Sequence, residues 1–493
     1  MVSLIYAGDY LNIQSLKNDT YIAGYRGVRL EEWWARHYPV GFTVPAILFE
    51  KALHLNDERH VFYFRHLLTF LICFFGVFSV FKIAERRFGD WRVGILAAAF
   101  LILSPRFFAE SFYNSKDLVL MSWVAIVLNS MIALILKPTW GRLFLHSLAS
   151  AMAIDIRLMA IVFPIATLCL LAFRVLQRKL LVRKAVAMTF FYLSFIAIFV
   201  FLTWPYLWAD PWVRLVEALV YMFKLNFPVQ SLYLGSMYAS NQLPWHYLPV
   251  WIVISTPPLY IFLFLIGSAW TAKQTVFQGR DLNLSDQFIQ DLIFFLYFWL
   301  PVLAIVIRGS TLYDGWRHVY FIYPAFLLLA TKGFVILRDI RLPSRLYAPG
   351  IVIFTLICLL TTGWWMKKNH PYQNVYFNFL AGENWKQSFD VDYWGLANRQ
   401  AVEYIADHDP RSLIKVTASN PVLMPLEMAK TVISPAQKSR IHILGDINQR
   451  QQADYLITNY RLDPYGPKDD AFLLIHEITV DKEVIVSIFQ RKP

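Results

Sequence analysis

Long apolar stretches, separated by short polar loops, fill the chain from residue 67 to residue 365. A hydrocarbon core about 30 Å thick needs about 20 apolar residues per helix, because lipid offers no partner for backbone N–H and C=O groups. The pattern therefore predicts an α-helical polytopic membrane protein with about ten transmembrane helices. These helices are expected at roughly 67–84, 93–104, 118–136, 143–156, 158–173, 186–204, 250–270, 289–307, 318–337 and 347–365.

After residue 365 the apolar stretches become short and suit a water-soluble fold. Residues 395–407 favour a helix, and residues 478–486 favour a hairpin with its turn at Asp481-Lys482. Further strands are expected at 413–416, 441–444 and 455–458. The chain is thus predicted to have three parts: an outward first loop with interfacial helices (1–66), a transmembrane helical domain (67–365) and a small C-terminal α/β extracytoplasmic domain (366–493).

Basic residues are distributed unevenly between the two sets of loops. The loops after the odd-numbered predicted helices hold 16 Lys and Arg in 54 residues, whereas those after the even-numbered helices hold 7 in 66. Loops rich in Lys and Arg stay in the cytoplasm. The second set of loops, residues 1–66 and the C-terminal domain are therefore expected outside.

The composition agrees with a membrane protein and excludes nucleic acid as a partner. Only 16% of the residues are charged and 57% are hydrophobic, whereas soluble chains have about 25% charged residues. Residues 366–493 hold 15 basic and 15 acidic residues, so the whole surplus of +12 belongs to the membrane part. Loop bias and anionic headgroups account for such a surplus, and no basic arm for binding phosphodiesters is present.

The outward loop before the third predicted helix carries Lys116 and Asp117. A lysine there could bind a lipid phosphate, and the aspartate could orient or deprotonate a hydroxyl group. A purely structural interpretation is also open, because Ser115 suits an N-cap and an acidic residue in the first turn complements the helix dipole.

Charged residues also occur beside or within apolar stretches at two further positions that are predicted to face outward. Arg317 and His318 precede the ninth predicted helix, where the planar guanidinium suits phosphate oxygens, although an interfacial arginine reaching the headgroups explains it equally well. Asp155 and Arg157 interrupt an apolar run. Because they are two residues apart they do not face each other on one helix, and they are expected at an outward helix–helix turn with Arg157 pointing into the external cavity. The structural alternative is a mutual pair across that turn.

Two aromatic and polar segments open the C-terminal domain next to the membrane. They are His370–Asn378 and Phe389–Gly395, and they could either cover an acceptor site or make ordinary domain-docking contacts. No Gly-rich phosphate loop, nucleophile elbow or metal-ligand spacing occurs in this part of the sequence.

Five strings together resemble a known family. The segments SPRFFAESFYNSKD, LPWHYLPVWIVISTPP, YDGWRHVYFIYP, HPYQNVYFNFLAGE and DVDYWG occur in this order between residues 104 and 395. They resemble bacterial polytopic membrane glycosyltransferases of the protein mannosyltransferase and aminoarabinose-transferase-like group, which have the C-type glycosyltransferase fold. The resemblance extends from about Tyr6 to Gly395.

The resemblance implies transfer of a sugar from a polyprenyl-phosphate donor to a lipid, glycan or protein acceptor. The implied location is the outer face of a bacterial cytoplasmic membrane. Asp117 matches an outward acidic position of the family, with Lys116 beside it, and Arg317 and His318 match a basic pair before a late helix. We assign Asp117 to catalysis and Lys116, Arg317, His318 and Arg157 to binding of the donor phosphate.

One expected feature of the family is missing. Its first helix and the acidic pair that follows it would fall before Met1, so we expect a truncated catalytic N-terminus and 11 helices in a full-length form. Asp9 is the acidic residue that we carry forward as a second catalytic candidate, although it does not match that pair convincingly.

The implied mechanism is direct displacement at the anomeric carbon with a phosphate leaving group. No metal cluster is apparent, although a divalent cation shared by an acidic loop and the donor phosphate stays open. Two alternatives from other classes are a non-catalytic glycan- or lipid-binding membrane protein and a secondary transporter. The absence of a repeat and the clustering of polar residues at one face argue against a transporter.

Overall fold

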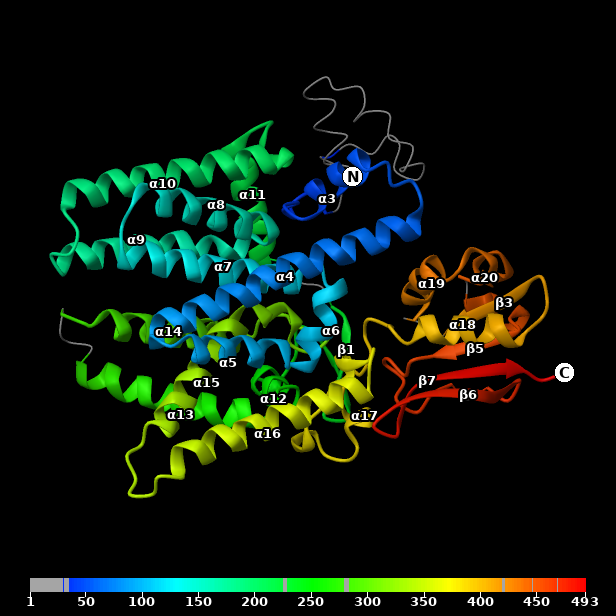
Figure 1. Ribbon diagram of the computed structural model, residues 1–493. Coiled ribbons are helices and arrows are strands. Elements are labelled where there is room, and N and C mark those ends of the chain that lie inside the picture. Colours follow the sequence, from blue (N-terminus) through cyan, green and yellow to red (C-terminus); the bar gives the residue numbers. More distant parts are fainter. Residues whose placement is uncertain are drawn as a thin grey trace.

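The computed structural model describes residue 30 and residues 35–493, except 225–227, 279–282, 419–421, 446 and 468. Asp9 lies outside the described residues, as does the predicted interfacial helix around Trp33-Trp34 for the most part. The described chain forms a bundle of long helices with a small mixed sheet at one end (Figure 1).

The bundle confirms the multi-pass helical fold. Eight helical segments in the described part of the chain are long and apolar enough to cross a membrane. They are α4 (Glu58–Phe88), α7 (Asp117–Leu136), η3–α9 (Leu158–Leu176), α10 (Val182–Thr203), α13 (Pro258–Gln278), α14 (Asp286–Arg308), η5–α15 (Arg317–Arg338) and α16 (Tyr347–Lys368).

The expected count of ten is reduced at two short elements. The second predicted span is α5 (Trp91–Ile102), which is followed after a bend of 72° by α6 (Pro105–Tyr113); together they count as a ninth span. Pro105 causes the break, because a proline disfavours helical geometry in the residue before it, and Ser104 is extended. The fourth is α8 (Trp140–Ile156), whose 17 residues reach only about 25 Å.

The seventh predicted span has different bounds. The segment 250–270 is divided into α12 (Tyr247–Ile254) and α13, with Pro257 and Pro258 at the break. Asn378 stabilises this break, because its side-chain amide donates to the carbonyls of Val253 and Thr256 at 2.6 and 2.7 Å. The Ser-Thr-Pro-Pro sequence was the available signal for it.

Figure 1 shows the membrane helices running roughly side by side, with the C-terminal sheet beyond one end of them. The C-terminal ends of α4, α7, α9 (Val162–Leu176), α13 and α15 (Tyr323–Arg338) lie at the opposite end. The loops that follow these helices are the lysine- and arginine-rich ones. All the basic loops therefore lie on one side, as the charge pattern predicts.

A close crossing of α13 and α15 fixes the helix that begins at the candidate site. Gly267 and Gly333 face the partner backbone, and an added Cβ would lie 2.0 Å from the Leu329 carbonyl oxygen and 1.9 Å from that of Leu263. Only glycine permits such an approach.

The C-terminal sheet has five strands in the order β4-β3-β5-β7-β6. β3 (Ile414–Ala418) pairs in parallel with β4 (Ile441–Ile443) and β5 (Tyr455–Thr458), and the hairpin of β6 (Phe472–Val480) and β7 (Glu483–Arg491) adds antiparallel strands. Asp481 and Lys482 both have positive φ, which is the geometry of a type I′ turn. The predicted helix is α18 (Asn398–His408), and α19 (Leu423–Val432) and α20 (Pro435–Arg440) accompany it.

The first membrane helix also reaches this domain. α4 has 31 residues and is about 46 Å long, so about ten of its residues extend past a 30 Å hydrocarbon core. Its outward end lies beside α19, and Lys438 forms an ion pair with Glu58 at 2.9 Å.

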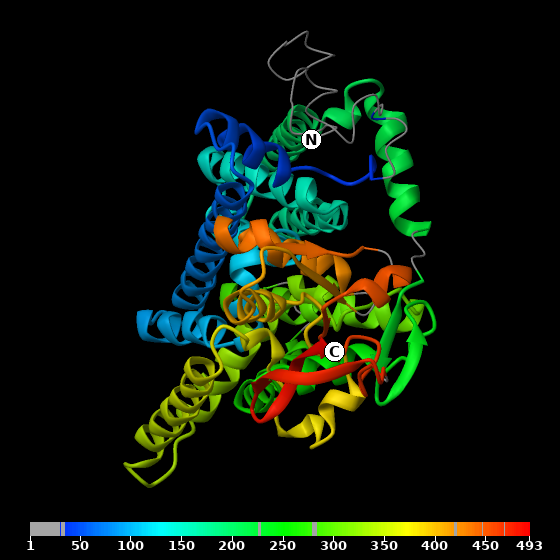
Figure 2. The ribbon, with the colours of Figure 1, turned by 90° about the vertical axis from the view of Figure 1, so that its right-hand side faces the viewer.

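Shorter elements surround the end of the bundle that carries the C-terminal domain, which faces the viewer in Figure 2. They are α3 (Thr43–Ala52), η4 (Pro205–Leu207), α11 (Pro211–Lys224), β1 (Gln230–Tyr233), β2 (Ser236–Ala239), η6 (Gln373–Val375), η7 (Phe379–Ala381) and α17 (Trp385–Ser388). The two-stranded sheet β1–β2 is antiparallel, and Tyr233 of β1 also forms a bridge with Phe389. Within the C-terminal domain, η8 (Ile447–Gln452) precedes β5.

Candidate functional site

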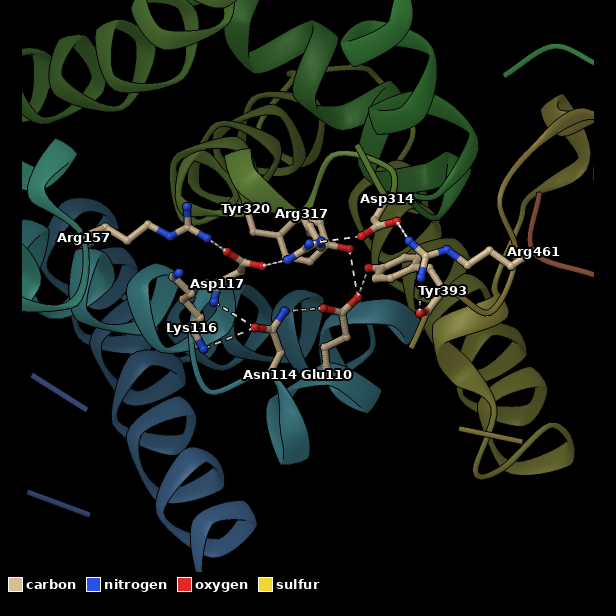
Figure 3. Close-up of polar contacts among 10 residues, drawn as sticks. All are labelled: Glu110, Asn114, Lys116, Asp117, Arg157, Asp314, Arg317, Tyr320, Tyr393 and Arg461. Atoms are coloured by element: carbon tan, nitrogen blue, oxygen red, sulfur yellow. Dashed lines mark hydrogen bonds and ion pairs between the residues drawn. The ribbon is translucent and has the colours of Figure 1, made fainter. Parts of the chain in front are cut away.

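Five charged side chains alternate in sign along a row at the end of the bundle that carries the C-terminal domain (Figure 3). Asp117 accepts hydrogen bonds from Arg157 on one side and from Arg317, at 2.9 Å, on the other. Arg317 also donates to Asp314 at 3.0 Å, and Arg461 donates to the second oxygen of Asp314 at 2.6 Å. We call these five residues the charge row.

The turn before α7 places Asp117 in this row. The Asn114 side-chain oxygen accepts hydrogen bonds from the backbone N–H groups of Asp117 and Lys116, at 2.8 and 3.3 Å. Asn114 therefore caps the helix, and the expectation that Ser115 does so is wrong. Asp117 is 2% exposed, which is low for a carboxylate that only complements a helix dipole at the surface.

A break between two helices brings Arg157 to Asp117. α8 ends at Ile156, and Arg157 has extended geometry before η3 (Leu158–Ile161) begins. Asp155 is fully buried, and its backbone carbonyl accepts a hydrogen bond from the Gly41 N–H. Asp155 and Arg157 are not paired, so the alternative of a mutual pair across the turn is wrong, and the partner of Arg157 comes from another helix.

A tight turn presents Arg317 and Asp314 together. Asp314 and Gly315 both have positive φ, so the chain reverses just before η5 (Arg317–Ile322). The Arg317 side chain also lies 5.4 Å from the Trp394 ring centroid and 5.0 Å from that of Tyr313. Arg317 is therefore held by two carboxylates and by aromatic rings and does not extend freely to the headgroups.

The C-terminal domain completes the row with a residue that sequence reasoning did not find. Arg461 follows β5 in a loop where Tyr460 and Leu462 have positive φ. Besides Asp314, it contacts the Tyr393 carbonyl at 3.3 Å. Nothing in the local sequence marks Arg461, because its partners are 68 and 147 residues away.

A second carboxylate lies beside the row. Glu110 on α6 is completely buried and accepts hydrogen bonds from Asn114 at 2.6 Å, Tyr320 at 3.0 Å and Tyr393 at 2.8 Å. The string SPRFFAESFYNSKD contains Glu110, but no role was predicted for this residue. Its place four residues before Asn114 on α6 was the available signal.

Lys116 and His318 lie at the same place. The Lys116 ammonium lies 4.1 Å from the centroid of the Tyr38 ring. Although the Lys116 side chain is exposed, loss of water around its head and the nearby Arg157 cation lower its pKa to about 8. The His318 ring packs 4.4 Å from Tyr313, and its Nδ1 atom is buried with no hydrogen-bond partner among the described residues.

The structure thus brings together five of the six predicted site residues: Asp117, Lys116, Arg317, His318 and Arg157. We call the ten residues drawn in Figure 3 the charge cluster. Its four cations and three carboxylates leave one positive charge uncompensated if all are ionised. Within the described part of the chain, the Nε atoms of Arg157, Arg317 and Arg461 are buried without a hydrogen-bond partner. The cluster therefore has charge and donors available for an anion.

No group of three or more His, Cys, Asp or Glu side chains in the described residues is arranged to hold a metal ion. Such a group would bind a metal with protein ligands alone, and a divalent cation shared by an acidic loop and the donor phosphate stays an untested possibility.

The two segments that open the C-terminal domain make docking contacts and also reach the cluster. Asp392 accepts hydrogen bonds from the Asn374 side chain at 2.9 Å and from the Ala397 N–H at 3.2 Å, and its carbonyl accepts from Asn459. These bonds hold Asp392 in place, and the next residue, Tyr393, contacts Glu110. The contacts favour the interpretation that the two segments dock the C-terminal domain onto the membrane helices.

An apolar cavity of about 600 Å³ lies in the membrane beside the charge row. It is lined by α7, η3, α9, α14 and η5, and its polar surface is minimal. Leu120, Met159 and Phe321 line it, and they follow Asp117, Arg157 and Arg317 by only two to four residues. The cavity therefore begins beside the part of the row formed by Arg157, Asp117 and Arg317.

Residues 53–206 match the family model of dolichyl-phosphate-mannose-protein mannosyltransferases. This segment runs from the end of α3 to η4 and contains Glu110, Lys116, Asp117 and Arg157. The match confirms the predicted resemblance over that segment and supports a membrane glycosyltransferase. No characterised protein sequence matches the chain significantly.

Several solved structures resemble the chain weakly. ArnT from Cupriavidus metallidurans in the apo state is 12% identical with a TM-score of 0.48, and the alignment covers 92% of this chain and 87% of that one. The apo oligosaccharyltransferase of Archaeoglobus fulgidus is 9% identical, with a TM-score of 0.44 and coverages of 86% and 62%. The arabinofuranosyltransferase AftD from Mycobacteria is 13% identical, with a TM-score of 0.38 and coverages of 91% and 35%. These similarities do not establish a shared activity.

Proposed function

We propose that this protein transfers a sugar from a polyprenyl-phosphate donor to an acceptor at the outer face of a bacterial cytoplasmic membrane. The observation that carries the proposal is the charge cluster, with its surplus positive charge and its unpartnered buried donors. The family match over residues 53–206 supports the same class of reaction. The basic loops at the far end of the bundle support an outward location for the cluster.

The charge balance suits a polyprenyl-phosphate sugar. Such a donor is a phosphodiester with a single negative charge, which equals the one uncompensated positive charge of the cluster. Arg157, Arg317 and Lys116 are the groups that we expect on the phosphate oxygens, because guanidinium and ammonium groups make strong charge-assisted hydrogen bonds there. Binding would then leave the buried site neutral.

The apolar cavity beside the row fits the lipid part of the same donor. Its volume of about 600 Å³ lies in the range of ligand sites, and it begins next to Arg157 and Arg317. An isoprenoid chain in this cavity would keep the phosphate at the row, so the lipid and the charge would be bound at adjacent places.

In the reaction, the bond between the anomeric carbon and the phosphate oxygen breaks, and a bond to the acceptor oxygen forms. The electron pair of the broken bond stays on the phosphate, where the cations neutralise the charge that develops. Asp117 lies between two guanidiniums and holds both in place, so we assign it a positioning role toward the phosphate. The acceptor proton needs a separate base, and Asp9 stays the predicted residue.

Substitution of Arg317 tests this proposal in detergent-purified full-length protein. Arg317→Ala is expected to weaken binding of undecaprenyl phosphate by about 10–100-fold, because hydrogen bonds to charged groups contribute about 1.5–3 kcal/mol each. Arg87→Ala is the matched control: this arginine also holds a buried carboxylate, at 2.6 Å, but at the other end of the bundle. Unchanged affinity in folded Arg317→Ala protein would contradict the phosphate role.

Transfer itself is measured with a radiolabelled pool of polyprenyl-phosphate sugars and native membranes as the acceptor source. Labelled product that depends on the protein supports the proposal. Tight binding of the donor without any product would favour the non-catalytic lipid-binding alternative.

A further inference from the structure

A second cavity lies between the membrane helices and the C-terminal domain. Its volume is about 410 Å³, within the range of ligand sites. It is lined by the outward part of α4, by α6, by the segment 370–373, by residues 394–399 and by α19, and most of the lining is aromatic or aliphatic. We call it the interdomain pocket.

The interdomain pocket continues into a bilayer-facing surface. Phe112 and His66 both line the pocket. The Phe112 ring stacks on the exposed ring of Phe70, with 5.3 Å between the centroids, and Phe70 lies about one turn after His66 on α4. Leu67, Phe74 and Phe78 extend the exposed apolar surface of α4 toward the membrane. A lipid chain can therefore pass from the bilayer into the pocket without crossing polar surface, whereas a soluble ligand would gain nothing from such a path.

Polar groups are present at a few points of the lining. Arg399 is exposed there and forms an ion pair with Glu403, one turn away on the same helix, at 2.9 Å. Such a surface ion pair is weak, so a stronger anion can replace Glu403. Tyr113 and Trp394 also line the pocket, and their hydroxyl and indole N–H groups are buried without a partner in the described part of the chain. An apolar pocket with such groups suits an amphipathic molecule.

One wall of the pocket, formed by Trp394 and Tyr113, lies against the charge cluster. The centroids of the Trp394 and Tyr113 rings lie 5.7 Å apart, and the Arg317 guanidinium lies 5.4 Å from the centroid of the Trp394 ring. Glu110 is three residues before Tyr113 on α6, and it accepts a hydrogen bond from Tyr393, the residue before Trp394, at 2.8 Å. The apolar interior of the pocket is therefore separated from the cluster by one layer of side chains, and a headgroup that extends past this layer reaches the cluster.

We propose that the interdomain pocket binds the apolar part of a lipid acceptor, whose hydroxyl-bearing headgroup is presented to the charge cluster. This inference rests on the proposed function and names the class of its acceptor. The apolar cavity of about 600 Å³, assigned above to the lipid part of the donor, lies next to Arg157 and Asp117, whereas the interdomain pocket lies next to Glu110 and Trp394. Two lipid-accessible cavities at two ends of one cluster are what a transfer between two membrane-bound substrates requires.

Two methionines on α19 provide the test. Met428 lines the pocket and is 51% exposed, so Met428→Trp should narrow the pocket without overpacking a core. Met424, one turn earlier, is 72% exposed and does not line the pocket, so Met424→Trp is the control. In bilayer discs made from native lipid extract, Met428→Trp is expected to lower transfer into the lipid fraction more than tenfold. Affinity for undecaprenyl phosphate should stay within twofold, and Met424→Trp should change neither quantity.

Three outcomes would overturn the inference. Unchanged transfer in Met428→Trp would show that the pocket is not used. Equal loss of undecaprenyl phosphate binding would make it part of the donor site. Label recovered only in protein or water-soluble glycan would mean that the acceptor is not a lipid.

A second measurement does not depend on turnover, so it separates failure of this inference from failure of the proposed function. With p-benzoylphenylalanine at position 428, irradiation in native membranes should crosslink a hydroxyl-bearing glycolipid or other minor lipid, identified by mass spectrometry. Crosslinks to bulk phospholipids in proportion to their abundance would contradict the inference, whether or not transfer is observed.

Discussion

Two groups of buried charges lie at opposite ends of the membrane helices, and they differ in how completely they are satisfied. At the basic-loop end, Asp291 on α14 accepts two hydrogen bonds of 2.6 Å from Arg87 on α4, and it pairs with Lys332 on α15 at 2.8 Å. Lys332 in turn donates to Thr271 and Gln274 on α13, both at 2.9 Å. We call this group the inner cluster.

The two clusters differ in whether their buried polar side-chain atoms have hydrogen-bond partners. None of the side-chain polar atoms of Arg87, Asp291 and Lys332 is among the buried unpartnered atoms of the described residues, but three arginines of the outward row each have one. Both groups are costly to bury. The comparison indicates that the inner cluster joins four helices, and that the outward cluster keeps donors for a ligand.

The strongest test of this comparison is removal of the inner carboxylate. Asp291→Asn leaves two cations without their partner, and breaking a buried pair costs about 3–5 kcal/mol. We expect a marked drop in the unfolding midpoint, measured by dye-based thermal unfolding in detergent. The protein that stays folded should transfer sugar at the normal rate per molecule. A selective loss of donor binding would contradict a purely structural role.

The corresponding change in the charge cluster should affect transfer more than stability. Asp117→Asn removes the group that positions Arg157 and Arg317, and we expect transfer to fall by about 100-fold or more, as for loss of one preorganised electrostatic group. Its unfolding midpoint should drop less than that of Asp291→Asn and should recover when undecaprenyl phosphate is added. Normal transfer by folded Asp117→Asn protein would remove Asp117 from the site.

The pH dependence of donor binding should report on Lys116. Its pKa is lowered to about 8, and an anionic donor binds the charged form, so affinity falls as the pH rises through that value. At pH 9 only about a tenth of this lysine stays charged, and the loss should reach severalfold. Lys116→Arg should remove the dependence, since arginine keeps its charge. An unchanged profile in that variant would assign the titration to another group.

The smallest expected effect concerns the contact between the C-terminal domain and Glu110. Tyr393→Phe removes one hydrogen bond of 2.8 Å to a carboxylate that keeps two others. We expect a loss of about 1–2 kcal/mol in the free energy of unfolding and a reduction in transfer of no more than tenfold. The matched control is Tyr404→Phe on α18, whose ring stacks on His476 within the domain. A hundredfold loss of transfer in Tyr393→Phe would instead place Glu110 in the reaction.

Features with a local cause could be predicted from the sequence. The membrane helices, the strand positions of the small sheet and the turn at Asp481-Lys482 follow from hydrophobic pattern and turn chemistry. Where prolines intervene, as at Pro105 and Pro257, the apolar pattern continues across a break in the backbone, so hydropathy alone merges or misplaces the helices.

The site was predictable only in part for the same reason. Lys116, Asp117, Arg157, Arg317 and His318 stand out because charge is rare beside apolar helices. Arg461 lies in a soluble domain with many charges, so nothing local distinguishes it from its neighbours. The buried hydrogen bonds of Glu110 depend on Tyr320 and Tyr393, which are 210 and 283 residues away, and only the folded chain brings them together.

The length of α4 has a consequence for the choice of membrane. A continuous helix of 31 residues, unlike a flexible linker, holds the C-terminal domain at a fixed height above the hydrocarbon region. Headgroups in a thicker or thinner bilayer would then meet that domain at the wrong level. We expect the rate of transfer in reconstituted vesicles to pass through an optimum as acyl-chain length is varied, which is hydrophobic mismatch expressed as enzyme activity.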